Sequence, residues 1–324
     1  MADMGLIADV GGTNIRLALV DIHTGEINHI QKYLCAHFPG IEEAILHYLS
    51  TVECHIKDAC IAIACPTDHD LISMTNHSWS FSQSDTKKCL NLNNFWVIND
   101  FTANAMSLPT LKDNQKIQIG GKSAVVGAPV SIYGPGTGLG VAHLVIVNGR
   151  YIPLSTEGGH VDFAPASELE NEILSFLRGR FGHVSSERVL SGPGLVNIYQ
   201  ALCHINQHVV NEEFQPKDIT HFGLTGTHPV CEQTLSVFCQ IMGSFGGNLA
   251  LTLGAFGGVY IAGGVIGNFL DYFLVSDFRR RFEEKGRFDG YCSQIPVYLI
   301  TAKQPGLQGA SAFLRQELGY RLES

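Results

Sequence analysis

Residues 6–20 read Leu-Ile-Ala-Asp-Val-Gly-Gly-Thr-Asn-Ile-Arg-Leu-Ala-Leu-Val, and this stretch decides the fold. Two apolar runs flank the turn Gly11-Gly12-Thr13-Asn14, which is the pattern of a β-hairpin. Farther along, the sequence predicts a helix over 41–49 and strands over 59–64 and 95–98. Strands that alternate with helical stretches are typical of an α/β domain.

A second glycine turn resembles the first. Residues 131–147 form two apolar runs around a turn rich in glycine, and the dipeptide Asn148-Gly149 that follows predicts another hairpin turn. Gly12, Thr13 and Ala18 match Gly136, Thr137 and Ala142 at one offset of 124 residues (136 − 12 = 124). We therefore interpret the chain as two similar halves.

Glycine turns of this kind suit a phosphate chain, because glycine lets backbone N–H groups approach closely. Two such turns could hold one triphosphate from two sides. The sequence matches neither of two better known phosphate-binding motifs. Gly121-Lys122-Ser123 ends like a P-loop, but Lys116 stands where that motif needs glycine. Residues 136–140 do not extend to the dinucleotide pattern G-x-G-x-x-G.

The composition describes a globular chain without a nucleic-acid-binding face. It has 324 residues, of which 45% are hydrophobic and 16% are charged. This length and hydrophobic content are enough for two lobes, each with its own hydrophobic core. The net charge of −9 and the lack of a long basic tract argue against a nucleic-acid partner. Arg279-Arg280-Arg281, followed by Glu283 and Glu284, predicts an exposed helix face with ion pairs.

The cysteines and the N-terminus indicate a cytoplasmic protein. The nine cysteines are scattered and never spaced C-x-x-C, so neither a disulfide framework nor a zinc ribbon is expected. The first residues carry Asp3 and Asp9 and no basic segment, unlike a secretory signal.

One long uncharged stretch invites a test for a membrane span. Residues 233–270 carry no charged side chain, but they contain nine glycines and no flanking Lys/Arg bias. We predict instead a buried helix over 235–253, a break at 256–258 and a buried strand over 259–262. A further helix is expected from Ser167, with Glu170 completing a capping box.

Five motifs, in order along the chain, resemble the bacterial glucokinase family of the hexokinase-like type. They are Asp9-Val10-Gly11-Gly12-Thr13-Asn14, Asn99-Asp100-Phe101, Gly136-Thr137-Gly138, Glu157-Gly158-Gly159-His160 and Ala262-Gly263-Gly264. The resemblance implies an α/β fold of the two-lobed actin-like ATPase (ribonuclease H-like) type, with nucleotide and sugar in the cleft between the lobes. It places 1–110 plus 302–324 in a small domain and 111–301 in a large one. It also suggests a homodimer.

The resemblance also implies a role for each site residue. Asp100 is implied to be the catalytic base, and the hexose contacts are Asn99, Glu157, His160 and Glu187. ATP is implied to lie against Ala8, Asp9, Val10, Gly11, Gly12, Thr13, Gly136, Thr137, Gly138, Gly263 and Gly264. Asp9 is implied to sit beside Mg²⁺, through water, because that ion keeps much of its hydration shell.

Each of these side chains also has an ordinary structural interpretation. Asp100 follows the apolar run 95–98 and fits a helix N-cap as well as a general base. Glu157 could be a solvated loop acid, and His160 a buried histidine with satisfied hydrogen bonds. Glu187 could stabilise the start of a helix over 188–190 through the helix dipole. Asp9 could simply end a strand.

Two departures from related families matter. The neighbouring repressor/ORF/kinase family follows its Glu-x-Gly-His motif with zinc-binding cysteines, but residues 161–202 contain none. His69 stands in the turn 66–70 where we expect glycine, which questions how tight that turn is. Thr75, Asn76, His77 and Trp79 resemble a segment of the small lobe to which we assign no role.

We therefore predict an ATP-dependent glucokinase that makes glucose 6-phosphate. One alternative is a kinase of another hexose, mannose or fructose, because the orientation of one hydroxyl group is not readable from sequence. Another is a sugar-sensing protein of the same fold without turnover. Against the sensor stand the presence of Asp100 and the lack of a DNA-reading segment before the first strand. An Hsp70-like ATPase would need a substrate domain for which 324 residues leave no room.

Overall fold

The structure is a computed structural model that describes residues 3–74 and 77–322. The chain forms two compact units. Unit 1 comprises Met1–Gln115, Ile146–Ser155 and Thr301–Ser324, and unit 2 comprises Lys116–Val145 and Thr156–Ile300. The domain boundaries expected from the sequence stay a prediction.

Unit 1 is built on a five-stranded mixed sheet of order β3-β2-β1-β4-β7. Its elements are β1 (Met4–Val10), β2 (Asn14–Asp21), β3 (Ile27–Leu34), α1 (Ile41–Val52), β4 (Asp58–Ile63), β5 (Leu71–Ser73), β6 (Ser80–Ser82), α2 (Gln83–Cys89), β7 (Asn94–Asn99), α3 (Asp100–Ser107) and α12 (Pro305–Glu317). β1 pairs antiparallel with β2, as the opening stretch predicts, and parallel with β4. The hairpin, the helix and both strands expected here are confirmed.

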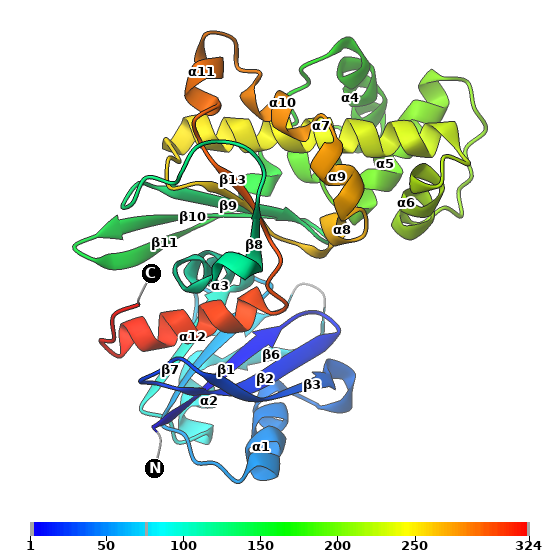
Figure 1. The fold of residues 1–324 in the computed structure, drawn as a ribbon. Helices are drawn as coiled ribbons and strands as arrows, with labels where there is room; N and C mark the ends of the chain where they lie inside the picture. The colour runs from blue at the N-terminus through cyan, green and yellow to red at the C-terminus, as the bar shows by residue number, and fades with distance from the viewer. Residues whose placement is uncertain (1–2, 75–76, 323–324) are drawn as a thin grey trace. The chain divides into compact units, whose positions relative to one another are not determined.

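Alternate residues of β1 enter two separate cores, so both faces of the sheet are covered. Leu6, Ala8 and Val10 pack with α1. Ile7, on the opposite face, packs with Ala103 of α3 and with three residues of α12. Figure 1 shows α12, in red, lying along α3 on that face. A strand buried on both faces accounts for the continuous apolar run that precedes the glycine turn.

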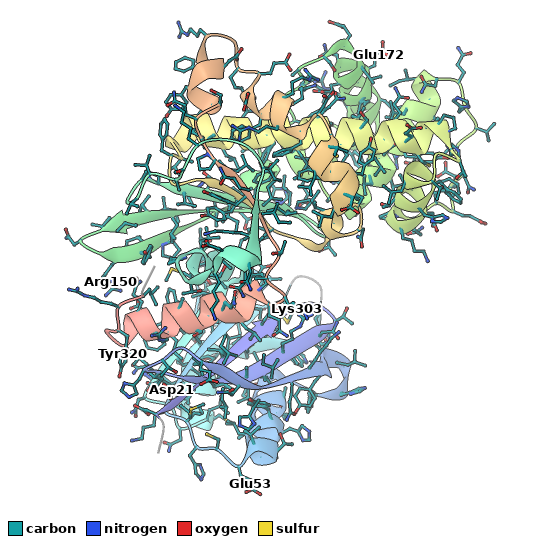
Figure 2. All side chains as sticks on the ribbon, in the orientation of Figure 1. Asp21, Glu53, Arg150, Glu172, Lys303 and Tyr320 are labelled. Atoms are coloured by element: carbon teal, nitrogen blue, oxygen red, sulfur yellow. The ribbon has the colours of Figure 1, made fainter. Side chains whose placement is uncertain are left out.

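Side-chain contacts hold the margins of unit 1 together. The turn at Thr24-Gly25 is fixed by Asp21, labelled in Figure 2, whose carboxylate accepts hydrogen bonds from the N–H groups of His23 and Thr24. Arg150, also labelled there, forms a 2.6 Å ion pair with Glu317 of α12.

Unit 2 is built around a six-stranded sheet of order β11-β10-β9-β12-β13-β8, to which the hairpin segment 146–155 also belongs. The elements of this part are β8 (Lys116–Gln118), β9 (Val130–Pro135), β10 (Leu139–Val147), β11 (Arg150–Thr156), α4 (Glu168–Phe181), α5 (Gly192–Ile205), α6 (Pro216–Leu224), α7 (Pro229–Leu253), β12 (Val259–Ile261), α8 (Gly264–Gly267), α9 (Leu270–Val275), α10 (Phe278–Glu283), α11 (Asp289–Cys292) and β13 (Val297–Ile300). Asn148 and Gly149 both have positive φ, as the predicted hairpin turn requires.

The uncharged stretch forms a buried helix followed by a strand, as predicted. α7 is 25 residues long, ends at Gly254 in the left-handed conformation and packs in the same core as Tyr133, Val259 and Val297. It is the long yellow helix of Figure 1. Within residues 3–74 and 77–322, no helix is long and apolar enough to cross a bilayer.

The two halves repeat one topology. Each sheet contains an antiparallel meander whose first strand pairs parallel with a later strand, giving β3-β2-β1-β4-β7 and β11-β10-β9-β12-β13. The hairpins differ by one residue, because four residues separate Val10 from Ile15 and three separate Pro135 from Leu139. The internal repeat inferred from three matched residues is therefore present in the strand order.

Two local predictions need correction. Arg279 and Arg280 pair with Glu283 and Glu284 as expected, but Arg281 is buried with only 5% of its surface exposed. Ser167 caps α4 by accepting from the N–H of Glu170. The Glu170 carboxylate, however, accepts from the N–H of Ala166 instead of completing the box on Ser167.

The turn at residues 66–70 is held by hydrogen bonds although it lacks the expected glycine. The backbone of His69 lies outside the left-handed region, and the carboxylate of Asp70 accepts from the Ser82 hydroxyl and the Ser84 N–H. Trp79 is a core residue whose indole N–H donates to the carbonyl of Phe38. Thr75 and Asn76 lie outside the described residues.

Candidate active site

Unit 1 brings Asp9, Asn99 and Asp100 to one edge of its sheet. β1, β4 and β7 run parallel, and Val10 is level with Ile63, which is level with Asn99. The carboxyl ends of these strands therefore share an edge, and that edge is where ligands bind in open α/β sheets. Asp9 and Asn99 are separated there by a single strand.

Asp9 lies beside the first glycine turn with one carboxylate oxygen already engaged. Its Oδ2 accepts from Nη1 of Arg16 at 3.1 Å, and 25% of its side chain is exposed. Burial raises the pKa of Asp9, and the charge of Arg16 opposes that shift. Gly306, near the start of α12, leaves space next to the carboxylate, since a Cβ there would lie 3.1 Å from Cγ of Asp9. The strand-end interpretation holds, and the carboxylate stays accessible.

Backbone hydrogen bonds hold the first glycine turn in place. Gly11 N–H donates to the carbonyl of Asn14, and Cys35 N–H donates to the carbonyl of Thr13, both at 2.9 Å. Ala8 and Val10, in the strand before the turn, are fully buried, main chain and side chain alike.

Asn99, not Asp100, caps α3. Oδ1 of Asn99 accepts from the N–H groups of Phe101 and Thr102 at 2.9 and 3.3 Å, whereas Asp100 is the first residue of the helix. The N-cap interpretation of Asp100 is therefore wrong. Asp100 is partly exposed, and Oδ1 accepts from the Phe101 N–H at 2.9 Å. Burial, with the charge of Asp100 second, raises the pKa of Cys65 to about 11.

Unit 2 brings the second glycine turn against Glu187. Oε2 of Glu187 accepts from the N–H of Leu139 at 2.8 Å, and a Cβ on Gly138 would lie 2.5 Å from that oxygen. Glu187 lies in a three-residue 3₁₀ helix, Ser186–Arg188, so the expected helix over 188–190 is wrong. The carboxylate stabilises the turn directly.

The loop with Glu157 and His160 lies against the same turn. A Cβ on Gly159 would lie 2.0 Å from the carbonyl oxygen of Leu139, so only glycine allows this approach. Both Glu157 and His160 are exposed, which excludes the interpretation of His160 as a core histidine. The loop that carries Glu157 and His160, and the carboxylate of Glu187, thus both lie against Leu139.

Gly263 and Gly264 lie at the carboxyl end of β12, next to the end of β9. The two strands are parallel neighbours, and Gly263 has a φ of 94°. A Cβ on Gly263 would lie 2.4 Å from the carbonyl oxygen of Pro135, and one on Gly134 would lie 2.2 Å from that of Ala262. Both Gly263 and Gly264 are exposed. Thr137 is exposed and Gly136 is partly exposed beside them.

Among the described residues, the cysteines and acidic residues do not assemble a metal-binding cluster. All nine cysteines are free thiols. Within the part of the chain that the structure describes, no group of three or more His, Cys, Asp or Glu side chains could hold a metal ion.

Sequence reasoning missed one feature of unit 2. Arg281 reaches a buried carboxylate, that of Glu170, 111 positions earlier in the chain (281 − 170 = 111). The only sequence signal was the glycine pattern Gly243, Gly246, Gly247 in the uncharged stretch, which permits a helix to approach closely.

Comparisons with known proteins agree with this fold. A family model described as Glucokinase matches residues 6–317. The glucokinase of Tolumonas auensis is 53% identical over 322 residues, covering 99% of this chain and 100% of the relative. A crystal structure of glucokinase from an Antarctic psychrotroph has a TM-score of 0.91 at 37% identity, covering 98% of this chain and 100% of that one.

A more distant structure shows the same fold. A ROK family glucokinase from Streptomyces griseus, in complex with glucose and AMPPNP, has a TM-score of 0.63 at 19% identity and covers 97% of this chain and 99% of that one. These neighbours have the two-lobed actin-like fold, and the predicted fold class is confirmed.

Proposed function

The chain belongs to the glucokinase family, and from that premise we propose that it transfers the γ-phosphoryl group of ATP to the 6-hydroxyl group of D-glucose. The observation that carries the proposal is the 53% identity to a named glucokinase over 99% of this chain. Beside it stands the carboxylate of Asp100, which follows the carboxyl end of β7, one of three parallel strands. Phosphoryl transfer needs mainly alignment of the acceptor hydroxyl and neutralisation of charge.

Asp100 is the proposed general base. Asn99 supplies the cap of α3, and Asp100, at the first position of that helix, has a partly exposed carboxylate. It can therefore take the proton of the acceptor hydroxyl as that oxygen attacks the γ-phosphorus. The bond between the γ-phosphorus and the bridging oxygen breaks, and ADP leaves with that electron pair.

Four side chains are proposed to bind the hexose. Carboxylates such as Glu157 and Glu187 accept hydrogen bonds from sugar hydroxyl groups, and a neutral His160 can both donate and accept. Asn99 keeps its amide group for the sugar, since Oδ1 is used in capping and Nδ2 makes only a 3.5 Å contact with the Cys65 carbonyl.

The glycine turns are proposed to bind ATP through backbone N–H groups. The residues are those of 8–13, 136–138 and 263–264, where glycines allow close approach to phosphate oxygens.

The residues present also fit Mg²⁺. Proteins commonly hold this ion through one or two carboxylates, several waters and the substrate phosphates, rather than in a cage of protein ligands. Asp9 supplies one partly exposed carboxylate with one oxygen left over from its Arg16 contact, and Gly306 leaves room beside it. When bound, Mg²⁺ neutralises charge on the β- and γ-phosphates.

One assay tests the two alternatives, a kinase of another hexose and a sugar-sensing protein without turnover. Production of ADP, measured with MgATP and a panel of glucose, mannose and fructose, should be fastest with glucose. Faster turnover of another hexose would favour the kinase of that sugar, and binding of glucose without ADP production would favour the sensor. The family resemblance further supports a cytoplasmic homodimer, and sedimentation velocity should give about twice the chain mass of 35.3 kDa.

A further inference from the structure

A buried ion pair lies in unit 2, and neither of its residues is proposed to touch substrate. Nη2 of Arg281, on α10, lies 2.7 Å from Oε1 of Glu170, on α4, and only 6% and 2% of the two side chains are exposed. Replacing a buried pair of this kind by apolar residues often leaves stability unchanged. The pair is therefore better explained by the arrangement of α4 and α10 that it fixes.

Glycines on α7 bring α10 close enough to form the pair. A Cβ on Gly243 would lie 2.2 Å from the carbonyl oxygen of Phe278, and one on Gly247 would lie 2.4 Å from that of Phe282. Both contacts are with the backbone of α10 or its end, so neither glycine can be replaced without moving the helix. The close approach sets Arg281 against α7.

The guanidinium of Arg281 is held on several sides. It donates to the hydroxyl of Ser244 from Nε at 3.2 Å and from Nη2 at 2.8 Å, and Nη1 donates to Oε1 of Gln240 at 3.3 Å. With its position set by α7, Arg281 presents a fixed charge to the carboxylate of Glu170.

Glu170 connects the fixed Arg281 to the segment that follows His160. Its second oxygen, Oε2, accepts from the backbone N–H of Ala166 at 2.8 Å. Ala166 lies six residues after His160 (166 − 160 = 6), in the stretch that joins the hexose loop to α4. One carboxylate therefore bridges a helix-held arginine and a loop backbone.

The same stretch is paired with the one that carries Glu187. Phe163 N–H donates to the carbonyl of Val184 at 3.0 Å, and Ser186 N–H donates to that of Val161 at 2.8 Å. A displacement of residues 161–166 would therefore move both His160 and Glu187.

Apolar packing alone does not hold this stretch. A cavity of about 300 Å³ lies between it and α7, bordered by Val161, Phe163, Ser186 and, on α7, Ser244 and Asn248. Where a loop borders a cavity, few van der Waals contacts oppose its displacement.

We infer that Glu170 and Arg281 are a positioning pair for the hexose-binding loop, fixing Glu157, His160 and Glu187 through Ala166. The inference rests on the proposed function for its kinetic consequence, but the geometric part does not. Neither residue touches the reacting atoms.

The test uses the double variant Glu170→Met/Arg281→Met, which removes both charges without leaving one unpaired. We expect the KM for glucose to rise at least about tenfold, as one lost hydrogen bond predicts. The KM for ATP should stay within about twofold and the thermal midpoint within a few degrees. Amide hydrogen exchange should become faster over 161–166 and 184–188. Glu170→Gln, which keeps an acceptor for the Ala166 N–H, should give a smaller rise.

Two control variants separate positioning from general destabilisation. Arg280→Gln removes the exposed ion pairs of the preceding residue on α10. It should change neither the KM for glucose nor the thermal midpoint. Phe282→Leu weakens buried packing on α10 and should lower the thermal midpoint without changing the KM for glucose.

Unchanged exchange over 161–166 in the folded double variant would overturn the inference, as would a normal KM for glucose or an equal rise in Phe282→Leu. If the unmodified protein does not phosphorylate glucose, the proposed function fails, and the exchange measurement still decides whether the pair positions the loop.

Discussion

The backbone N–H of Leu139 donates a 2.8 Å hydrogen bond to Oε2 of Glu187, which stands 48 residues later in the chain. A residue of the second glycine turn and a residue proposed to bind hexose thus share one polar contact. The position of the Glu187 carboxylate depends on the turn, so changes in the turn should alter the affinity for the sugar.

Gly138→Ala should weaken glucose binding. The new Cβ would lie 2.5 Å from Oε2 of Glu187, so the carboxylate must leave the Leu139 N–H. We expect the Kd for glucose to rise about tenfold, the cost of one hydrogen bond, as measured by isothermal titration calorimetry. Gly179→Ala on α4, where nothing lies within 4 Å, is the matched control. An unchanged Kd in Gly138→Ala would argue against a hexose role for Glu187.

Asp100→Asn should separate an enzyme from a sensor. The amide keeps the shape of the side chain but cannot accept the proton, so kcat should fall at least about 10²-fold, while the Kd for glucose changes less than about tenfold. Stability should not change, because Asn99 supplies the helix cap. Near-normal kcat in steady-state assays of the folded variant would remove Asp100 from the mechanism.

Asp9→Asn should reduce activity without reducing stability. Burial raises the pKa of Asp9, so ionising this carboxyl group costs more free energy in the folded protein than in the unfolded chain. The neutral amide avoids that cost, and the thermal midpoint at pH 7 should be equal or higher. We expect kcat with MgATP to fall at least about 10²-fold, since charge stabilisation by a metal contributes several kcal/mol. A lower midpoint together with normal kcat would contradict both expectations.

Activity should depend on magnesium and not on zinc. Removal of Mg²⁺ should abolish ADP production, because the phosphates of ATP then carry unneutralised charge. A zinc-selective chelator should have no effect, since no cluster of three metal-binding side chains occurs among the described residues. Loss of activity together with release of one zinc ion per chain would be the opposite result.

His143 should make stability fall at acidic pH. Burial lowers the pKa of His143, whose Nδ1 lies 3.0 Å from the hydroxyl of Ser131. The folded protein binds this proton less readily than the unfolded chain. The contribution of His143 to stability is therefore present above the unfolded pKa of about 6.5 and is lost as the pH falls through the folded value. His143→Gln should lose less thermal stability than the unmodified protein between pH 7 and pH 5. Equal losses would show that other groups cause the effect.

The sequence by itself determined the elements whose signals are local. Both glycine hairpins, the strands after them and the buried helix over 235–253 follow from apolar runs, turn residues and their spacing, which act over a few residues. The offset of 124 residues predicted a repeat, and the strand order of the two sheets contains it. The family resemblance named the residues of the site but not their contacts.

The tertiary structure decided which polar side chains are used within the fold. Asn99 rather than Asp100 caps α3, and Glu187 binds the Leu139 N–H. Arg281 is buried on Glu170 although Arg280, the preceding residue of α10, pairs at the surface. Local pattern cannot assign these partners, because a charge run has the same spacing whether its helix faces water or another helix. What turns Arg281 inward is the close approach allowed by Gly243 and Gly247, and that approach exists only once α7 and α10 are packed together.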